Sequence, residues 1–500
     1  MKPAPVNRTT ARRGALTVVA ACAALALVIR GRRSANPATA VVARGQLRRN
    51  ARLATLATRS GSRAALHRAR RTFASAARRE ELDSRHQLRT AADVAAALGE
   101  MKGVMMKLGQ MASYVDETMP EPMRAALASL QQDAPPMSPQ LAAGVVREEL
   151  GGEPGDVFAT WDSVPIAAAS IGQVHRAMTH DGRAVAVKVQ YPGVDAAIRS
   201  DLETTDLLFR AVGMMFPGLD PKVIVDELKV RLTEELDYQI EANNQRLFAD
   251  WFCDHPFIHV PAVVAELSTR RVLTTELASG ARFEEVATTW TQAERDLAAE
   301  TIFRFVFRGI YRIHAFNGDP HPGNYLFAPG GHVTFLDFGL VKRYTAPEVA
   351  LFEDLIRAMC FRHDIAWFRR LIEQAGVLLT GAAVTDEQVR SYFGHFYEFV
   401  IEDRVVTFDA EYASGTVRQM FDLGGPQAAV AKVANVPSAF VVTQRINLGL
   451  HAVLAQLHAT ANWRRIAEEI WPFVAGPPST PAGVLEAEWL GRTHAQDFVT

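Results

Sequence analysis

Residues 316–324 read FNGDPHPGN and residues 337–339 read DFG, and these two stretches decide the interpretation of the chain. Asp319 and Asn324 are five positions apart, and Asp337 opens the second stretch after a gap of 12 residues. Carboxylate and amide oxygens are the hard ligands that Mg²⁺ prefers, and a carboxylate such as Asp319 can orient or deprotonate a hydroxyl or a water molecule. The spacing therefore predicts a catalytic loop and a metal-binding loop joined by a hairpin.

A strand expected over residues 183–190, RAVAVKVQ, supplies a cation upstream of these loops. Its valines alternate with Ala184, Ala186 and Lys188, which leaves room over the lysine for a flat or charged ligand. The Asp-Gly pair at 181–182 predicts the hairpin turn before it. ATP carries about four negative charges that phosphoryl transfer must neutralise. VAVK, DxxxxN and DFG in this order indicate phosphoryl-transfer machinery, and the absence of a GK[ST] sequence excludes a Walker A loop.

The composition is that of a globular protein with more than one domain. A 500-residue chain with 48% hydrophobic and 22% charged residues is neither wholly disordered nor collagen-like. Three scattered cysteines, Cys22, Cys253 and Cys360, are too few for a disulfide framework or a Cys-rich zinc site. They fit a reducing compartment.

The first 80 residues differ in charge from the rest. Residues 1–79 hold 18 Lys and Arg and no Asp or Glu, which leaves 36 basic and 55 acidic residues, a net charge of −19, in the remainder. An uncharged run at 14–29, flanked by arginines, would form a helix of about 24 Å and is a candidate transmembrane anchor. A cleaved signal peptide is the rival, because residues 38–40 resemble a cleavage site.

The location follows from the same leader. More Lys and Arg follow the run at 14–29 than precede it, which favours a cytoplasmic body. Only eight lysines against many arginines, with abundant alanine, indicate a high-GC coding bias, which favours a bacterium and therefore a bacterial inner membrane. The Arg-rich segment at 41–79 fits a surface on anionic lipid headgroups and a solvated linker equally well. An organelle transit peptide also fits this acid-free start.

Four further motifs resemble one family. They are KLGQ at 107–110, AAASIGQVH at 167–175, ELD at 235–237 and the glutamate Glu241. Together with the loop and DFG they resemble the UbiB/AarF-type atypical kinases, a protein-kinase-like family linked to isoprenoid-quinone biosynthesis. The resemblance extends from about residue 85 to at least 345. It implies an α+β, bilobal protein-kinase-like fold with an N-terminal helical extension that carries the KxGQ motif and a mostly helical C-lobe.

The resemblance also implies a domain order and a covered cleft. The charge distribution gives a basic leader (1–80), which the resemblance does not cover. The resemblance implies the other expected parts, which are a helical KxGQ extension (81–150), a kinase-like N-lobe (151–280), a kinase-like C-lobe (281–480) and a tail (481–500). In the family the extension packs over the region where a protein kinase would admit a peptide. This favours a small, lipid-like or internal acceptor, or ATP hydrolysis, over ordinary protein phosphorylation.

The resemblance assigns roles to individual residues. Catalytic roles fall to Asp319, Lys188 and Glu241, nucleotide binding to Ala167, Ala168, Ala169, Ser170, Ile171, Gly172 and Lys188, magnesium binding to Asn324 and Asp337, and regulation to Lys107, Gln110, Glu235 and Asp237. Glu276 and Leu277, in a hinge expected over 272–280, would face the adenine by their position alone. Alanine restricts the backbone more than glycine does, so the nucleotide loop should be less mobile than a Gly-rich one.

Three acids near the candidate αC helix need separate partners. In one continuous helix Asp237 and Glu241 share a face, whereas Glu235 lies about 200° from Asp237. By family analogy Glu241 then pairs with Lys188, and the other two acids meet Lys107.

Alternatives stay open on the function. NGDPHPGN also resembles the HGDLHxxN loop of aminoglycoside and choline kinases, and Asn317-Gly318 stands where many UbiB/AarF members have His-Ala, so a metabolite kinase is one rival. A nucleotide-regulated, non-catalytic lipid binder is another. His314 and His321 are not expected to bind metal, and His321 is expected to shape the loop. The expected partners are ATP with Mg²⁺, a membrane lipid or an isoprenoid or quinone intermediate, a second copy of the chain or quinone-biosynthesis proteins, and no nucleic acid.

Overall fold

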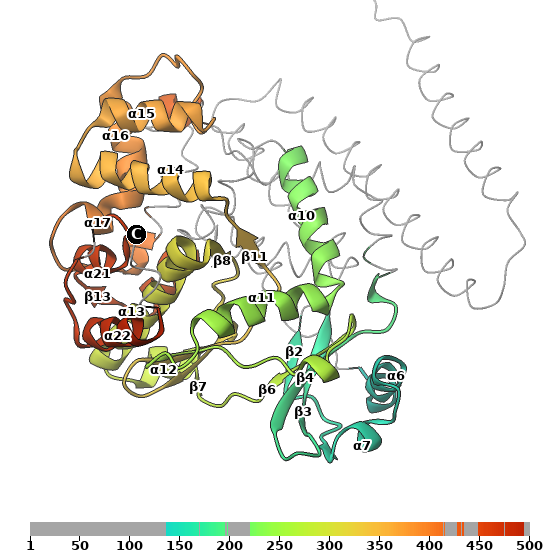
Figure 1. Cartoon of the computed structure of the whole chain (residues 1–500). Helices are drawn as coiled ribbons and strands as arrows, with labels where there is room; N and C mark the ends of the chain where they lie inside the picture. The colour runs from blue at the N-terminus through green and yellow to red at the C-terminus, as the bar shows by residue number, and fades with distance from the viewer. Residues whose placement is uncertain are drawn as a thin grey trace, which may run out of the picture. The chain divides into compact units, whose positions relative to one another are not determined.

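The computed structural model of the chain describes residues 137–169, 171–195, 198, 221–413, 415, 428–431, 433–434, 449–474 and 476–494 (Figure 1). The leader at 1–80, the candidate transmembrane helix at 14–29 and the KLGQ stretch at 107–110 lie outside these residues. Within the described ranges, no helix combines the length and the apolar character needed to cross a membrane.

An antiparallel five-stranded sheet forms the first part of the described fold. Its strands lie in the order β1-β3-β4-β6, and β2 pairs with the first three residues of β3. They are β1 (Thr160–Trp161), β2 (Ala167–Ala169), β3 (Gly172–Met178), β4 (Ala184–Gln190) and β6 (Val272–Glu276). Gly182 turns the chain between β3 and β4 with φ of +87°, which glycine adopts without strain. The predicted hairpin is therefore present.

Helix α6 (Pro139–Leu150) covers one face of this sheet. Its Ser138 cap accepts a hydrogen bond from a first-turn N–H, and the left-handed Gly151 ends it. The three valines of β4 are fully buried in a core that includes apolar side chains of α6. The alternate residues of β4, including Lys188, lie on the opposite face. Burying the valines thus fixes the face on which the lysine must lie.

Two helices replace the single helix expected around the ELD motif. Helix α10 (Pro221–Glu235) ends before Asp237, and helix α11 (Tyr238–Trp251) begins after it. Asp237 is extended (φ −129°, ψ 97°), and its carboxylate accepts the Gln239 N–H at 3.0 Å. The continuous helix was therefore a wrong prediction, because aspartate favours the N-cap position over a helix interior. Glu241 occupies the first turn of α11.

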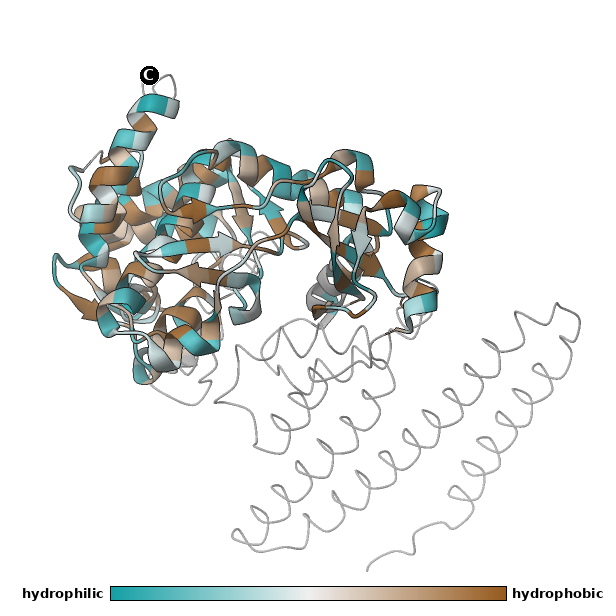
Figure 2. Ribbon diagram, turned by 90° about the horizontal axis from the view of Figure 1, so that it is seen from below, coloured by the Kyte–Doolittle hydropathy of each residue, from teal (hydrophilic) through white to brown (hydrophobic). Residues whose placement is uncertain are grey.

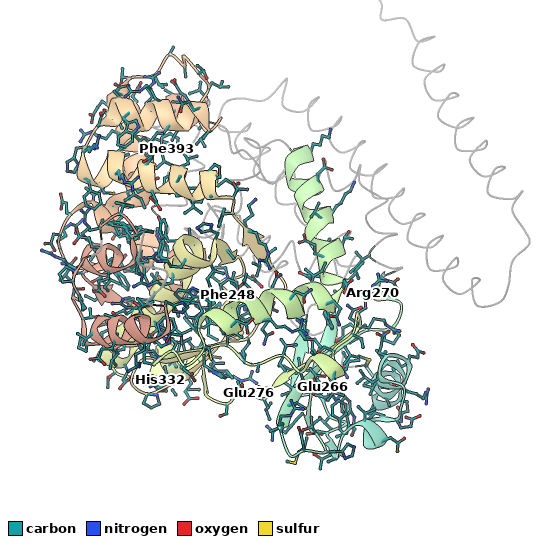
Figure 3. The ribbon with its side chains drawn as sticks, in the orientation of Figure 1. Phe248, Glu266, Arg270, Glu276, His332 and Phe393 are labelled. Carbon is teal, nitrogen blue, oxygen red and sulfur yellow. The ribbon has the colours of Figure 1, made fainter. Side chains whose placement is uncertain are left out.

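Helix α11 joins the sheet to the helical part of the chain. At its start the Tyr238 N–H donates to the Arg270 carbonyl at 2.9 Å. Phe248 lies near its end (Figure 3). The Phe248 ring packs against Phe305 and Phe338, with ring centroids 5.4 and 5.2 Å away. One rigid helix thus contacts both the sheet edge and the aromatic core.

A second sheet carries the segment that contains both diagnostic motifs. Its order is β5-β10-β9-β7, with β5 and β10 parallel and the other pairs antiparallel. These strands are β5 (Ile258–His259), β7 (Ala281–Arg282), β9 (Tyr325–Ala328) and β10 (His332–Phe335). The predicted hairpin is β9–β10. In the sequence, strand β8 (Ala315–Asn317) precedes this hairpin and strand β11 (Val341–Arg343) follows it, and these two strands pair with each other in a separate sheet. The 3₁₀ turn η4 (Pro322–Asn324) lies directly before the hairpin.

Helices make up most of the remaining structure, and hydrophilic and hydrophobic residues are interspersed along the longer ones (Figure 2). The other elements are α7 (Pro154–Val157), η2 (Ala265–Leu267), α12 (Phe283–Thr289), α13 (Gln292–Arg308), the π-helical η3 (Gly309–Ile313), α14 (Ala346–Ile356), the π-helical η5 (Arg357–Phe361), α15 (Ile365–Gln374), α16 (Asp386–Gly394), η6 (His395–Tyr397), α17 (Glu398–Ile401), β12 (Val406–Thr407), α19 (Ala428–Ala431), β13 (Thr460–Ala461), α21 (Trp463–Ile470) and α22 (Pro481–Thr493). Strands followed by a helical bulk match the predicted α+β class.

Candidate active site

A cavity of about 670 Å³ lies between the lysine face of the first sheet and the hairpin β9–β10. Predicted site residues that line it are Ala167, Ala168, Ala169, Lys188, Glu241, Glu276, Leu277, Asn324 and Asp337. Those placed by the structure outside its lining are Ile171, Gly172, Glu235, Asp237 and Asp319. Ser170, Lys107 and Gln110 lie outside the described residues.

Lys188 lies at the centre of a cluster of acids. Its ammonium donates to both carboxylate oxygens of Glu241, at 2.8 and 2.9 Å, and lies 3.7 Å from Asp337 Oδ2. The Tyr238 ring lies 5.1 Å from the ammonium and adds a cation–π contact. Strand β4 supplies the lysine and the first turn of α11 supplies the glutamate, so this ion pair joins the sheet to the helix.

Burial and charge act in opposite directions on this cluster. Burial lowers the pKa of Lys188, but the carboxylates of Asp337 and Glu241 outweigh it, and the pKa lies well above its usual value. Burial raises the pKa of Glu241 to about 7, although the lysine partly offsets this. Lys188 is therefore a cation at neutral pH, and Glu241 is the member of the pair that accepts a proton first.

Asp319 and Asn324 meet beside the cavity. The Asn324 side-chain amide donates to the Asp319 main-chain oxygen at 3.0 Å and to its Oδ2 at 3.3 Å. Asp319 is only 6% exposed, and its Oδ1 has no hydrogen-bond partner among the described residues. A buried carboxylate oxygen without a donor is costly, and a bound cation or hydroxyl would remove that cost.

Side-chain amides hold the main chain of the DFG segment. Asn317 Nδ2 donates to the Asp337 carbonyl at 2.6 Å, and Asn244 Nδ2 donates to the Phe338 carbonyl at 3.2 Å. The Gly339 N–H donates to Asp337 Oδ1 at 2.8 Å. These three contacts fix the carboxylate that faces Lys188. No pattern in the sequence pointed to Asn244, although it lies one helical turn after Glu241.

Asn317 contacts both diagnostic loops. While its Nδ2 holds Asp337, its Oδ1 accepts the Asp319 N–H at 3.4 Å. Its strand neighbour Gly318 donates its N–H to the Leu340 carbonyl at 2.7 Å. The sequence signal for this role was the Asn317-Gly318 pair that stands where many similar sequences have His-Ala. The amide supplies both a donor and an acceptor at this position.

The alanine-rich stretch forms strand β2 rather than an irregular loop. Its residues pair antiparallel with the start of β3, and Ala169 lies opposite Gly172. A side chain on Gly172 would collide with the Val189 carbonyl oxygen and lie 2.8 Å from the Tyr238 hydroxyl. Gly172 is therefore required for strand packing beneath the cavity.

Two residues of the same motif form a buried polar chain. The Gln173 side-chain oxygen Oε1 accepts the Met137 N–H at 2.9 Å, and its side-chain Nε2 donates to His175 Nε2 at 2.8 Å. His175 Nδ1 then donates to the Asp162 carbonyl at 2.8 Å. Burial lowers the pKa of His175, which agrees with a neutral ring that donates at one nitrogen and accepts at the other. These residues attach β3 to the segments at Met137 and Asp162.

The hinge residues line the cavity, but their peptide N–H groups are occupied. The Glu276 N–H donates to the Ala262 carbonyl at 2.8 Å, and the Leu277 N–H donates to the Ala184 carbonyl at 3.0 Å. The Glu276 carboxylate lies 3.3 Å from His259. At these two positions only carbonyl oxygens and side chains can contact a base.

His314 and His321 have local structural roles. His314 ends η3 in the left-handed conformation. His321 Nδ1 accepts the Gly323 N–H at 3.0 Å and so caps η4. In the part of the chain that the structure describes, no three His, Cys, Asp or Glu side chains form a metal-binding cluster. The oxygen donors of the two diagnostic loops are instead the Asp319 and Asp337 carboxylates and the Asn324 amide.

Comparisons with known proteins agree with this geometry. Residues 129–367 match the model of the ABC1 atypical kinase-like domain. The solved structure of Rv3197 from Mycobacterium tuberculosis, in complex with erythromycin, aligns with a TM-score of 0.58 and 32% identity over 80% of this chain and 100% of that chain. The chain belongs to the ABC1/UbiB (AarF-domain) family of atypical kinases. The predicted protein-kinase-like α+β fold is confirmed.

Curated members of the ABC1/UbiB family give the same result. AarF domain-containing protein kinase 1 of Mus musculus is 35% identical over 49% of this chain and 48% of its own length. The mitochondrial atypical kinase COQ8B of Rattus norvegicus is 35% identical over 49% of this chain and 46% of its own length. The chain thus spans about half the length of the curated relatives that it matches. An ABC1 kinase-like domain implies nucleotide binding.

Proposed function

We propose that this ABC1/UbiB chain binds Mg-ATP in the 670 Å³ cavity and transfers or hydrolyses its γ-phosphate. The observation that carries the proposal is the convergence of Lys188, Glu241 and Asp337 on one side of the cavity, with Asp319 and Asn324 beside it. The three members of the first group come from β4, α11 and the loop that follows β10. All three side chains lie in the wall of the cavity, where a ligand can reach them.

The residues present fit a magnesium ion. Asn324 and Asp337 offer oxygen ligands, and the buried Asp319 Oδ1 has no hydrogen-bond partner within the described residues. Hard oxygen donors in a small number suit Mg²⁺, which keeps part of its water shell. When bound, Mg²⁺ would neutralise phosphate charge and fix the position of the phosphate oxygens.

The chain's own side chains have separable roles in this proposal. Lys188 binds phosphate oxygens, and Glu241 keeps its ammonium in place. Asp319 accepts a proton from the attacking hydroxyl or water, or orients it. The alanine-rich strand β2 lies along the cavity and allows less close approach of backbone amides than glycines would. This supports slow phosphoryl transfer or hydrolysis.

We extend the proposal to the wider role. The ABC1/UbiB chain would support isoprenoid-quinone or other lipid metabolism at a membrane, with its body in the cytoplasm and its leader as the anchor. Relatives are named as mitochondrial and chloroplastic proteins, which agrees with organelle or bacterial membranes. A lipid or quinone intermediate, a second copy or quinone-biosynthesis proteins would be its partners. The domain bounds given for the extension, lobes and tail, and the pairing of Glu235 and Asp237 with Lys107, belong to this proposal.

The test measures binding and turnover separately. The purified full chain should bind ATP in the presence of Mg²⁺ and release phosphate, and anionic liposomes should increase the rate. Asp337→Asn should abolish turnover, and Lys188→Ala should weaken ATP binding at least tenfold. Asp250→Asn, an exposed change on α11, is the matched control and should leave both unchanged.

Three outcomes would replace the proposal. If the chain binds ATP without turnover, and Asp319→Asn leaves the cellular function intact, the chain is better described as a nucleotide-regulated lipid binder. Efficient phosphorylation of a soluble hydroxyl compound without lipid would favour a metabolite kinase. Absence of any ATP binding by the folded chain would refute the assignment of the cavity.

A further inference from the structure

A second cavity lies within the helical part of the chain, away from the nucleotide cavity. Its volume is about 140 Å³. It is lined by residues of α13, η3, α14, α15, α16, η6, α17 and α21, and none of its lining residues also lines the 670 Å³ cavity. The two cavities are therefore separate sites.

The lining of this cavity is apolar and strongly aromatic. Every lining residue is Ala, Val, Leu, Ile, Phe, Tyr or Trp. Phe303 and Phe307 pack at 4.5 Å between ring centroids, and Phe368 packs against Phe393 at 5.9 Å. A comparable engineered cavity of about 150 Å³, lined by apolar side chains, stays dry and binds benzene. This cavity has the size and the chemistry for one small ring.

Two hydroxyl groups give the cavity a polar feature. Tyr311 on η3 and Tyr397 on η6 both line it. Burial raises the pKa of each phenol, so both are neutral hydroxyls at physiological pH. Tyr397 is only partly buried, so its hydroxyl is open to a partner that enters the cavity. A hydroxyl in an apolar environment without a partner is unfavourable, and a ligand with one polar group would satisfy it.

Two π-helical turns adjoin the cavity. Ile310 and Tyr311 belong to the first, η3, and the second, η5, begins directly after the lining residue Ile356. π-helical turns are rare and occur often at functional sites, because the extra residue widens the helix and opens space beside it. The widened helices account for the cavity without a missing side chain.

We propose that this cavity is a binding site for a small aromatic molecule that carries one hydrogen-bonding group, with the ring among the phenylalanines and the polar group at Tyr397. Nucleotide recognition is not part of the inference, which stands if the proposed ATP site fails. A bound ligand would contact η3, which leads after His314 into strand β8 and its residue Asn317. The site therefore lies on the chain segment that enters the DFG contacts.

Toluene and benzyl alcohol are suitable probes for the full chain. At about ten times its dissociation constant, toluene should raise the midpoint of thermal unfolding by about 2–4 °C, and the effect should saturate. Ala467→Leu fills the cavity from α21 and should abolish this shift. Ala366→Leu makes the same change on the exposed side of α15 and should retain it.

A conservative variant keeps the test decisive if Ala467→Leu does not fold. Tyr397→Phe removes one hydroxyl and leaves the ring, so toluene binding should persist. The affinity for benzyl alcohol relative to toluene should fall about threefold to tenfold, as expected for one hydrogen bond. No saturable effect of toluene on the native chain, or an unchanged ratio in Tyr397→Phe, overturns the proposal.

Discussion

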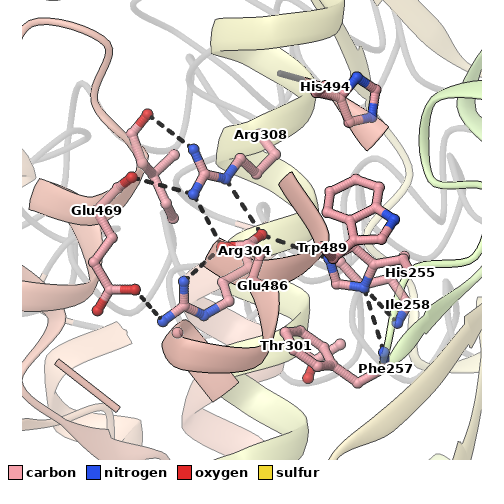
Figure 4. A network of polar contacts seen from close by, with 12 residues as sticks. His255, Phe257, Ile258, Thr301, Arg304, Arg308, Glu469, Glu486, Trp489 and His494 are labelled. Atoms are coloured by element: carbon pink, nitrogen blue, oxygen red, sulfur yellow. Dashed lines mark hydrogen bonds and ion pairs between the residues drawn. The ribbon is translucent and has the colours of Figure 1, made fainter. Parts of the chain in front are cut away.

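Glu486→Gln should strongly destabilise the helical part of the chain, because this side chain lies in a buried network of charges (Figure 4). Glu486 is 1% exposed on α22 and accepts from Arg304 Nη1 at 2.7 Å and from Arg308 Nη2 at 2.9 Å. Glu300 and Glu469 also bind Arg304, at 2.7 and 2.8 Å. Helix α22 is thus joined to α13 by ion pairs rather than by apolar contact alone.

The size of the effect follows from what remains after the change. Glutamine has nearly the same shape, and Arg304 keeps two carboxylate partners. Arg308 is 3% exposed, and of the described carboxylates only Glu486 contacts it, so its charge would be left with main-chain carbonyls. Breaking a buried ion pair on one side costs about 3–5 kcal/mol. At about 2–4 °C per kcal/mol, the unfolding midpoint should fall by about 10 °C.

Thermal unfolding of the full chain, followed by calorimetry, measures this shift. Glu387→Gln is the matched control, because its partner Arg390 and the acid itself are exposed, and it should move the midpoint by less than about 2 °C. The double change Arg308→Met with Glu486→Leu should recover most of the loss, since apolar residues can replace a buried ion pair. Equal midpoints for Glu486→Gln and the control, or a double variant no better than the single one, would refute the reasoning.

Three shorter predictions concern other parts of the molecule. Asn317→Leu removes the donor to the Asp337 carbonyl and should raise the Mg²⁺ concentration for half-maximal turnover about tenfold. Asn317→His keeps a donor and should need a Mg²⁺ concentration close to that of the native chain, and steady-state kinetics measure both values. Gln173→Leu leaves the Met137 N–H without its acceptor and should lower the unfolding midpoint by about 2–6 °C, and an unchanged midpoint would contradict the buried chain. Burial would raise the pKa of Glu486, but its arginine and histidine partners hold it well below the usual 4.5, so its stabilisation is complete above that pH and is lost as the pH falls further. As the pH falls, the free energy of unfolding of the native chain should therefore decrease more steeply than that of the Glu486→Gln variant. Parallel dependences of the two free energies on pH would contradict this prediction.

Local patterns were sufficient to predict the strands and the hairpin. Alternating valines determine which face of β4 is buried, so Lys188 could be placed on the open face from sequence alone. The Asp-Gly pair at 181–182 gave the turn because glycine tolerates a positive φ. Both signals act over a few residues, and nothing distant opposes them.

The helix break at Asp237 and the role of Asn244 were not predictable in the same way. A run of helix-forming residues surrounds Asp237, and only the N-cap geometry shows that its carboxylate prefers the Gln239 N–H. The Asn244 side chain donates a hydrogen bond to the carbonyl of Phe338, which is 94 residues away in the chain, and no pattern within α11 predicts that contact. Contacts at such separation depend on packing, which sequence periodicity does not encode.

Helix α11 explains why the lysine, the metal-binding segment and the aromatic core depend on one another. Glu241 in its first turn binds Lys188, Asn244 one turn later holds the Phe338 carbonyl, and Phe248 after a further turn packs on the Phe338 ring. Because the three contacts lie along one rigid helix, a displacement that loosens one of them also loosens the other two. We therefore expect a change that displaces α11 to weaken the ion pair at Lys188 and the contacts of the DFG segment together.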